Sequence, residues 1–368
     1  MADIYIGLMS GTSADSIDCA TLDLSSKDIK VLDCRNFEIP KDLRKDVIQS
    51  SQLKKIEKEL IDNLDFRMAE VLVETVKKII DELNLEVEDI KAIGSHGQTI
   101  KHEPKSEMPY TLQIGDPQKI SNDLKIRTVG NFRYDDIKAG GEGAPLTPVF
   151  HKIVFGEDKK KKVIVNIGGI TNITALDHTE VIGFDTGPGN CLMDCWSREN
   201  NVGNYDDKGS WASLGTVNQS LLETMMDDDY FSRKYPKSTG PDYFNHKWIK
   251  DNIAKSDNKI SPEDVQATLL QITVLSLVES INLLNLSKET IYLCGGGVHN
   301  EFLCNEITKQ SKAKVNTTLD LGIDPDYVEA ICFAWLAKQR IHNINFNLNK
   351  ITGSKGEVYL GRIYEPSK

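Results

Sequence analysis

The sequence lacks an excess of basic residues. Its 368 residues include 55 acidic and 44 basic ones, for a formal net charge of −11 at pH 7. A nucleic-acid-binding domain usually presents a basic face, so this charge balance argues against that class. The seven cysteines are odd in number and include no Cys-x-x-Cys pair, so they indicate neither a zinc site nor a disulfide framework. We expect reduced thiols in a cytosolic protein.

Long uninterrupted apolar runs are also missing. The most apolar stretch, 269–286, contains Gln271, Thr273 and Glu279, which predicts a buried helix and not a membrane span. The N-terminus has no basic segment followed by an apolar one, so we expect no signal peptide. These absences favour a cytoplasmic protein.

Several nucleotide-binding and hydrolase motifs are missing as well. No G-x-x-x-x-G-K-[ST] is present, and no G-x-G-x-x-G follows a predicted strand, so neither a P-loop nor a Rossmann site is indicated. The protein-kinase signature set, His-Glu-x-x-His and Gly-x-Ser-x-Gly are not found either. Any nucleotide site must therefore belong to another fold.

What the chain does contain is an alternation of strand and helix patterns. Apolar segments at 4–9 and 17–24 flank a small polar turn, and segments 162–167 and 170–176 repeat this pattern. Each pair predicts a β-hairpin, and one hairpin opens each half of the chain, which suggests an internal duplication. Helical spacing appears at 41–85, at 262–286 after the N-cap signal Ser261-Pro262, and at 328–342. The pattern predicts an α/β protein.

Four segments place glycine and small polar or acidic residues after an apolar strand. They are 7–18, 166–172, 185–190 and 295–300. Glycine lets a backbone approach a phosphate closely, and N–H groups then bind the anion. One such loop is usually a plain turn, whereas four in one chain favour phosphate binding.

Asp185-Thr186-Gly187 matches the tripeptide of aspartic proteases, which need two such aspartates sharing one proton. No second copy occurs. Two interpretations remain: Asp185 is a general base at a strand end, or it caps a turn or the helix that begins near Asn190. A lone histidine after a strand, such as His96, is more often structural than catalytic.

Taken together, the motifs resemble those of the anhydro-N-acetylmuramic acid kinases, in order from residue 7 to about 353. The matching segments are 7–18, 94–99, 112–117, 139–146, 166–170, 183–190, 236–240, 264–268, 294–300, 322–326 and Glu329-Ala330. The resemblance implies two RNase H-like domains of the actin/hexokinase/Hsp70 type with an ATP cleft between them. We place the domains at 1–130 and 131–368, with the last strand or helix as a candidate to pack back on the first domain.

By this resemblance, ATP and Mg²⁺ are the cofactors. Contacts to ATP are implied for Gly11, Thr12, Ser13, Ala14, Asp15, Ser16, Ile17, Asp18, Gly168 and Gly169 (phosphates) and for Gly295, Gly296 and Gly297 (nucleoside). The family also implies a homodimer, with no nucleic-acid or membrane partner.

The family's reaction combines hydrolysis with phosphoryl transfer. Asp185 would deprotonate a water that attacks C1 of 1,6-anhydro-N-acetylmuramic acid, and the freed O6 would attack the γ-phosphate of ATP. The products would be N-acetylmuramic acid 6-phosphate and ADP, in peptidoglycan recycling. Glu329 would hold sugar or Mg²⁺, or alternatively be a helix first-turn acid.

Arg133 would pair with the lactyl carboxylate, unless it is a surface arginine. His96, Gln98 and Asp116 are weaker candidates for sugar contacts.

Some positions depart from the family pattern. Ala14 and Ser16 replace the usual Leu and Gly, Asn131 replaces Asp, and Pro241-Asp242 replaces Arg-Glu. Ser16 loses glycine's backbone freedom, which matters if that position needs a positive φ. Two alternatives therefore stay open: a kinase for another anhydro sugar such as levoglucosan, and a non-catalytic nucleotide-binding relative.

Overall fold

The computed structural model describes residues 2–11, 13–53, 55–156, 160–177, 180–256 and 259–367. The chain divides into two units: the first combines 1–150 with 327–368, and the second is 151–326. The boundary predicted at 131 therefore falls inside the first unit. Buried Asp136 accepts hydrogen bonds from Thr352 Oγ1 (2.6 Å) and from the Gly143 N–H (2.7 Å). These bonds tie the segment after 131 to the C-terminal part of the same unit.

The first unit is built around a six-stranded sheet. Its elements are β1 (Ile4–Ser10), β2 (Ser16–Asp23), β3 (Lys30–Glu38), α1 (Lys41–Gln52), α2 (Lys58–Leu83), β4 (Ile90–Ser95), β5 (Gln98–Glu103), β6 (Tyr110–Ile114), α3 (Pro117–Leu124), β7 (Thr128–Gly130), α4 (Tyr134–Lys138), α12 (Val328–Ile341), β13 (Phe346–Asn347), β14 (Glu357–Val358) and β15 (Arg362–Tyr364). Helix α5 (Thr147–Phe155) spans the boundary to the second unit.

The strand order of this sheet is β15-β7-β4-β1-β2-β3. Strands β1, β2 and β3 are antiparallel neighbours, whereas β1, β4 and β7 run parallel. Helix α2 covers the sheet with a stripe that includes Leu64, Met68, Leu72 and Val76, spaced four residues apart. Leu64, Met68 and Val76 belong to the periodicity that predicts helical structure over 41–85, a range that the structure divides between α1 and α2.

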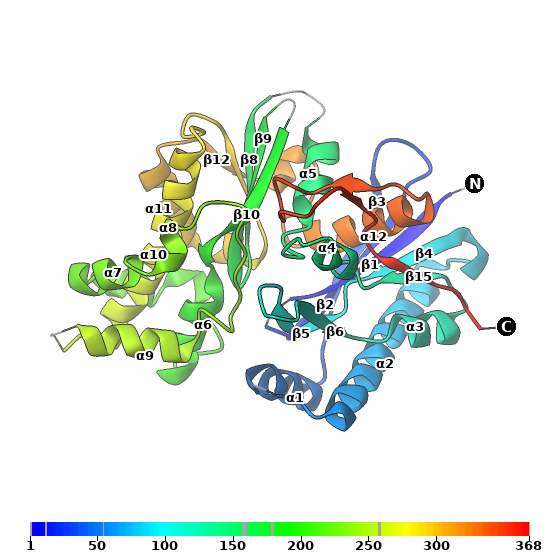
Figure 1. The fold of residues 1–368 in the computed structure, drawn as a ribbon, viewed down its shortest axis with the longest axis horizontal. Coiled ribbons are helices and arrows are strands. Elements are labelled where there is room, and N and C mark those ends of the chain that lie inside the picture. The colour runs from blue at the N-terminus through cyan, green and yellow to red at the C-terminus, as the bar shows by residue number, and fades with distance from the viewer. Residues whose placement is uncertain are drawn as a thin grey trace. The chain divides into compact units, whose positions relative to one another are not determined.

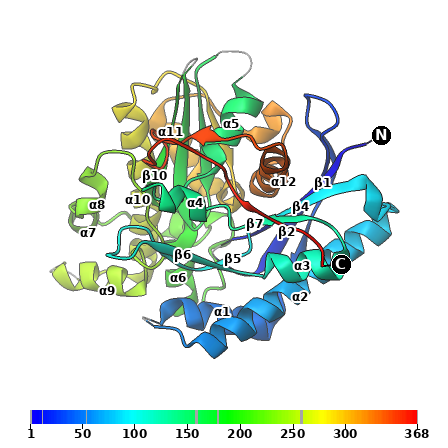
Figure 2. The same ribbon diagram turned by 45° about the vertical axis from the view of Figure 1, so that its right-hand side comes forward.

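Helix α12 comes from the far end of the chain and packs against β1 and β4 (Figures 1 and 2). Gly7 of β1 and Gly94 of β4 are register partners. A Cβ at Gly7 would lie 1.9 Å from the Ala330 carbonyl oxygen, and one at Gly94 would lie 2.1 Å from that of Phe333. The backbone of α12 therefore contacts the two strands directly at these positions. Only glycine, which has no side chain, permits so close an approach.

The second unit is built around a five-stranded sheet. Its elements are β8 (Lys162–Ile167), β9 (Ile170–Asp177), β10 (Glu180–Pro188), α6 (Asn190–Glu199), α7 (Gln219–Met226), α8 (Asp229–Ser232), α9 (His246–Lys255), α10 (Pro262–Leu283), β11 (Ile291–Cys294), α11 (Glu301–Ser311) and β12 (Val315–Thr317). The strand order is β10-β9-β8-β11-β12. Its core is formed by the sheet together with helices α6 to α11.

The two sheets repeat one topology. In each sheet, three antiparallel strands are followed along the chain by two strands that run parallel to the first. These five strands lie in the spatial order 3-2-1-4-5, and β15 adds a sixth strand at the edge of the first sheet. Strands β2 and β9 are both eight residues long and have identical patterns of buried and half-buried positions. The third residue of each, Asp18 and Asn172, faces its hairpin partner in the same way, opposite Met9 and Asn166. The predicted duplication and the fold of two RNase H-like domains are confirmed.

Helix α10 is the buried helix predicted from the apolar stretch. Ser261 Oγ accepts a hydrogen bond from the Asp264 N–H, and Pro262 occupies the first turn, as the capping signal predicts. By length and composition it is the one helix among the described residues that could cross a membrane, yet 72% of its most apolar window is buried.

Candidate functional site

Asp185 lies inside β10 and not in a loop after it, and backbone and side-chain groups hold it on several sides. Its side chain is 5% exposed, and Oδ2 accepts a hydrogen bond from the Thr239 N–H at 2.9 Å. The Asp185 N–H donates to the Lys237 carbonyl at 3.0 Å, and the Tyr230 hydroxyl donates to the Asp185 carbonyl at 2.7 Å. Helix α6 has Gly189 as its N-cap, so the interpretation of Asp185 as the cap of that helix is wrong.

Lys237 is a buried cation next to this aspartate. Its ammonium donates to the carbonyls of Tyr230 (3.2 Å) and Phe231 (3.4 Å) and lies 4.5 Å from the centre of the Tyr230 ring. The pKa of Lys237 is lowered to about 8, mainly by burial and also by repulsion from Arg233, while attraction to Asp185 and Glu279 opposes the shift. Asp185 and Lys237 thus interact electrostatically in a poorly solvated region.

A row of polar side chains crosses the sheet beside Asp185. In the strand registers, Asn166 of β8 faces Asn172 of β9, which faces Asp185 of β10. Directly opposite residues of antiparallel strands project from the same face. Within the described part of the chain, the side-chain oxygens of Asn166 and Asn172 are buried without a hydrogen-bond partner. Because an unpaired buried acceptor is costly, these carboxamides are suited to a polar ligand.

The turn at Gly168-Gly169 is occupied largely by its own fold. The Gly168 N–H donates to the Ile170 carbonyl at 3.1 Å. The Gly169 carbonyl accepts from the N–H groups of Gly189 and Cys191, and that of Gly168 accepts from Asn190. The hairpin turn therefore caps the N-terminus of α6.

The glycines after β11 divide into two kinds. Gly295 has a φ of 78° and donates its N–H to the Pro325 carbonyl at 2.9 Å. A Cβ at Gly297 would lie 2.3 Å from Ile167 Cγ2, whereas at Gly296 no atom of the described residues beyond its chain neighbours would lie within 4 Å of a Cβ. Gly295 and Gly297 are thus required by the fold, and Gly296 leaves open space for a ligand.

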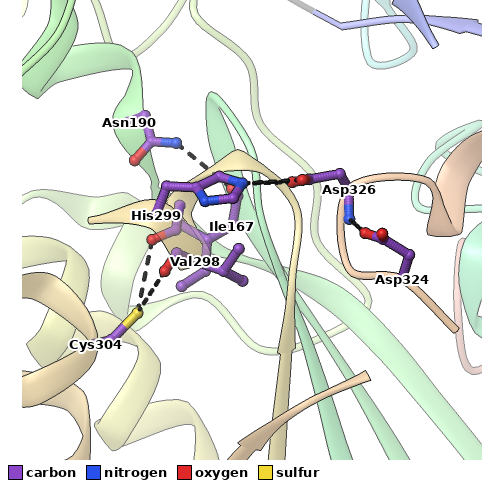
Figure 3. Close-up of polar contacts among 8 residues, drawn as sticks. Ile167, Asn190, Val298, His299, Cys304, Asp324 and Asp326 are labelled. Atoms are coloured by element: carbon purple, nitrogen blue, oxygen red, sulfur yellow. Dashed lines mark hydrogen bonds and ion pairs between the residues drawn. The ribbon is translucent and has the colours of Figure 1, made fainter. Parts of the chain in front are cut away.

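The same turn is held by side chains that follow it (Figure 3). His299 Nε2 lies 2.8 Å from Asp326 Oδ1, and the Asp326 N–H donates to Asp324 Oδ1 at 3.0 Å. Cys304 Sγ contacts the carbonyls of Gly297 and Val298. These contacts fix the path of the chain after β11.

In the first unit, the turn between β1 and β2 carries the residues expected to contact phosphate. Thr12 lies outside the described residues. Ser13 and Asp15 are exposed, Gly11, Ser16 and Asp18 are half-buried, and Ala14 and Ile17 belong to the core. Ala14, with φ 49°, has the left-handed backbone; Ser16 pairs with Glu38 as part of β2. The concern about Ser16 therefore does not apply, because that position needs no positive φ.

His96 and Arg133 are in direct contact. The Arg133 Nε–H donates to His96 Nε2 at 3.0 Å, and His96 Nδ1 lies 2.8 Å from the Gly97 carbonyl, to which it donates. Burial, with a smaller contribution from Arg133, lowers the pKa of His96 to about 3. The imidazole is therefore neutral, with one defined tautomer, and it orients the guanidinium.

The other sugar-contact candidates have structural partners. Gln98 Oε1, which is buried, accepts from the Ser10 hydroxyl at 2.6 Å, and Asp116 caps α3 by accepting from the Gln118 N–H at 2.8 Å. Glu329 is half-buried in the first turn of α12, one turn before Phe333, whose ring contacts His96. Asn131 donates to the Tyr364 hydroxyl.

Sequence reasoning missed Tyr230, Lys237 and Thr239 as neighbours of Asp185. They lie 45 to 54 residues away along the chain. The segment 236–240 was noted only as a family motif. This segment has a lysine among small polar residues and no apolar periodicity. Such a pattern indicates a loop, but it does not show which residues the loop contacts.

Comparison with known proteins gives consistent matches over nearly the whole chain. A family model described as anhydro-N-acetylmuramic acid kinase matches residues 3–366. The anhydro-N-acetylmuramic acid kinase of Aliivibrio fischeri is 41% identical over 364 residues, covering 98% of both chains. That of Coxiella burnetii is 40% identical, covering 98% of this chain and 97% of the relative.

Among solved structures, component A of (R)-2-hydroxyglutaryl-CoA dehydratase from Acidaminococcus fermentans matches with a TM-score of 0.48 and 8% identity. The match covers 90% of this chain and 96% of that one.

Proposed function

The chain belongs to the anhydro-N-acetylmuramic acid kinase family and is a sugar kinase; from this premise we propose that it opens the 1,6-anhydro ring of 1,6-anhydro-N-acetylmuramic acid by hydrolysis and phosphorylates O6. The products are N-acetylmuramic acid 6-phosphate and ADP. The observation that carries the proposal is Asp185, a buried carboxylate held from the backbone by Thr239.

Asp185 is the general base of this reaction. It takes a proton from a water whose oxygen forms a bond to C1, and the C1–O6 bond breaks. The released O6 then bonds to the γ-phosphorus of ATP, and the bond to the β–γ bridging oxygen breaks to release ADP. One proton is released overall. The Thr239 N–H keeps Oδ2 in place, so that the carboxylate is oriented before the substrate arrives.

ATP phosphates bind the turn Gly11–Asp18 of the first unit and the Gly168-Gly169 turn of the second. In the first turn, exposed Ser13 and half-buried Gly11 support this assignment. In the Gly168-Gly169 turn, several backbone groups already cap α6. This turn therefore makes fewer of the phosphate contacts than the motif implies. The open position at Gly296 supports a nucleoside contact along Gly295–Gly297.

Arg133 binds the lactyl carboxylate, because a guanidinium oriented by a neutral histidine matches the geometry of that group. His96 acts through Arg133. Gln98 supports the phosphate turn through Ser10, and Asp116, as a helix cap, makes at most an additional sugar contact.

Glu329 is the candidate carboxylate for sugar or Mg²⁺. Mg²⁺ is usually bound by one or two carboxylates together with substrate phosphates and water, and one half-buried carboxylate at a helix start fits that pattern. The described residues contain no group of three or more metal-ligating side chains. When bound, Mg²⁺ would neutralise charge on the β- and γ-phosphates.

We also propose, from the family, a cytoplasmic homodimer that serves peptidoglycan recycling. The domain division follows the two units, with 327–368 in the first.

The test is an ADP-release assay with Mg-ATP that compares three sugars: 1,6-anhydro-N-acetylmuramic acid, levoglucosan and N-acetylmuramic acid. Turnover with the first sugar, and formation of a 6-phosphate detected by mass spectrometry, is the expected result. Preference for levoglucosan would overturn the proposed substrate, and ATP binding without turnover on any sugar would overturn the proposed reaction.

A further inference from the structure

The side chain of Lys237 is buried in the second unit although it carries a charge. It is 5% exposed, and moving an ammonium out of water is costly unless other groups compensate. Two main-chain carbonyls and the face of the Tyr230 ring surround the ammonium. A methionine of similar length would fill this space without the desolvation cost, so packing alone does not explain a lysine here.

The charged groups that act on Lys237 come from three parts of the unit. Asp185 of β10 and Glu279 of α10 attract the ammonium, and Arg233, in the segment before it, repels it. Glu279 and Arg233 are exposed, so water screens their effect, whereas Asp185 is buried. Arg233 has the largest effect of the three on the pKa of Lys237, and of the two attracting carboxylates the buried Asp185 is less screened than Glu279.

Lys237 is also part of the chain segment that holds Asp185. Its carbonyl accepts the Asp185 N–H, and two residues later the Thr239 N–H donates to Asp185 Oδ2. The lysine side chain returns to the carbonyls of Tyr230 and Phe231, and the Tyr230 hydroxyl donates to the Asp185 carbonyl. Fixing the ammonium in this way therefore also fixes the two groups that donate to Asp185, the Thr239 N–H and the Tyr230 hydroxyl.

We propose that Lys237 is a positioning residue for Asp185: its charge favours the ionised carboxylate, and its anchored side chain holds the 237–239 segment against β10. The proposal rests on the proposed function, in which Asp185 acts as a base and must be ionised to accept a proton.

The proposal predicts how activity depends on alkaline pH. The pKa of Lys237 is lowered to about 8, so the ammonium loses its proton as pH rises through that value. The carboxylate then loses its attractive partner and the segment loses an anchor. We expect kcat to fall on the alkaline side with an apparent pKa near 8.

The kinetic experiment uses Lys237→Met, Lys237→Arg and, as a matched control, Lys234→Met at an exposed position of the same segment. We expect Lys237→Met to lower kcat about 10- to 100-fold with little change in the KM for ATP, and to move the acidic limb of the pH profile upward. Lys237→Arg keeps a charge that does not titrate, so it should retain most of kcat and lose the alkaline limb. Equal losses in both Lys237 variants, with the wild-type pH profile, would show that Lys237 only packs.

A second measurement does not depend on catalysis. An NMR titration of the Lys237 side chain would compare the wild-type protein with Asp185→Asn. Removing the carboxylate should lower the pKa of Lys237 further, because the attraction to Asp185 opposes the shift. An unchanged lysine pKa would overturn the proposal even if the enzyme is active. If the wild-type protein phosphorylates no anhydro sugar, the proposed function fails, and this titration still decides whether the two groups are coupled.

Discussion

At the scale of single residues, the candidate chemistry depends on backbone groups that fix Asp185. The carboxylate is held by a main-chain N–H, and the peptide groups around it are bonded to Lys237 and Tyr230. A base fixed in this way loses little freedom when substrate binds, which is how preorganised sites reduce the activation barrier.

Asp185→Asn is the direct test of the base. The asparagine side-chain oxygen can still accept from the Thr239 N–H, so the fold should be preserved, but a carboxamide cannot take a proton. We expect kcat to fall by about 10²- to 10⁴-fold with an unchanged Kd for ATP, measured by calorimetry. Asp177→Asn, at the surface ion pair with Lys161, is the control and should change neither. A variant Asp185→Asn with nearly wild-type kcat would remove Asp185 from the mechanism.

Arg133→Ala tests recognition of the substrate carboxylate. A hydrogen bond to a charged group contributes about 1.5–3 kcal/mol, so the KM for the muramic substrate should rise by roughly tenfold or more. The KM for levoglucosan, which has no carboxylate, should not change if that sugar is turned over. Arg35→Ala, which breaks a surface ion pair with Asp33, serves as the control. An unchanged KM for the muramic substrate would exclude the role.

Sequence alone identified Asp185 but not the residues that hold it. The Asp-Thr-Gly tripeptide has a chemical meaning that can be read locally. Lys237 and Tyr230 reach Asp185 only because a long excursion after β10 returns to it. No local pattern records such a return. The same holds for the contact of Arg133 with His96, which lies 37 positions earlier.

At the scale of elements, the strands that open each sheet were predictable and some others were not. Apolar runs flanked by small turns mark β1, β2, β8 and β9 clearly. Strand β3 contains Lys30, Asp33 and Arg35 and is mostly exposed at the sheet edge, so it shows no apolar alternation. Strand β10 contains Gly183, Gly187 and Pro188, and these residues indicated a loop where the strand continues past Asp185.

The packing of α12 on β1 and β4 gives a prediction about stability. Gly94→Ala places a methyl group against the Phe333 carbonyl, so the free energy of unfolding should fall by about 1–3 kcal/mol or more. Urea denaturation measures the effect.

The matched variant is Gly11→Ala, where no atom of the described residues beyond its chain neighbours lies within 4 Å of the new Cβ. It should leave the unfolding free energy nearly unchanged and weaken ATP binding instead. Equal stability of the two variants would contradict the close contact of α12 with the sheet.

At the scale of the whole molecule, the repeated topology was predictable from the two hairpins, but the boundary between the units was not. The boundary at 131 was placed together with the two domains that the family resemblance implies. In the structure the glycine-rich segment 139–145, which follows this position, is held by Asp136 and Thr352 within the first unit. A glycine-rich segment indicates a change of direction, and only long-range contacts show to which unit it belongs.

Buried histidines in both units predict sensitivity to acid. Burial is the main cause that lowers the pKa of His96, His102 and His151 to about 3. Since these folded-state values lie below the unfolded value of about 6.5, the unfolded chain binds more protons below that pH. Their contribution to stability is complete above pH 6.5 and declines as pH falls toward 3, by up to about 1.4 kcal/mol per pH unit for each histidine.

Urea melts at pH 7.5 and 5.0 measure this decline. His151→Gln removes one buried histidine and should flatten the pH dependence of the unfolding free energy. His342→Gln, at an exposed position, should leave it as in the wild-type protein. A decline of equal steepness in wild type and His151→Gln would contradict the assignment.

The division of the first unit into 1–150 and 327–368 has a consequence for biosynthesis. During translation, every strand of the first sheet except β15 leaves the ribosome long before α12, which must cover Gly7 and Gly94. The second unit is contiguous, so it can complete its fold while the first nascent sheet still has an uncovered apolar face. Chaperone demand should therefore concentrate on the N-terminal segment, and a circular permutant that joins 327–368 directly ahead of β1 should shorten that exposed interval.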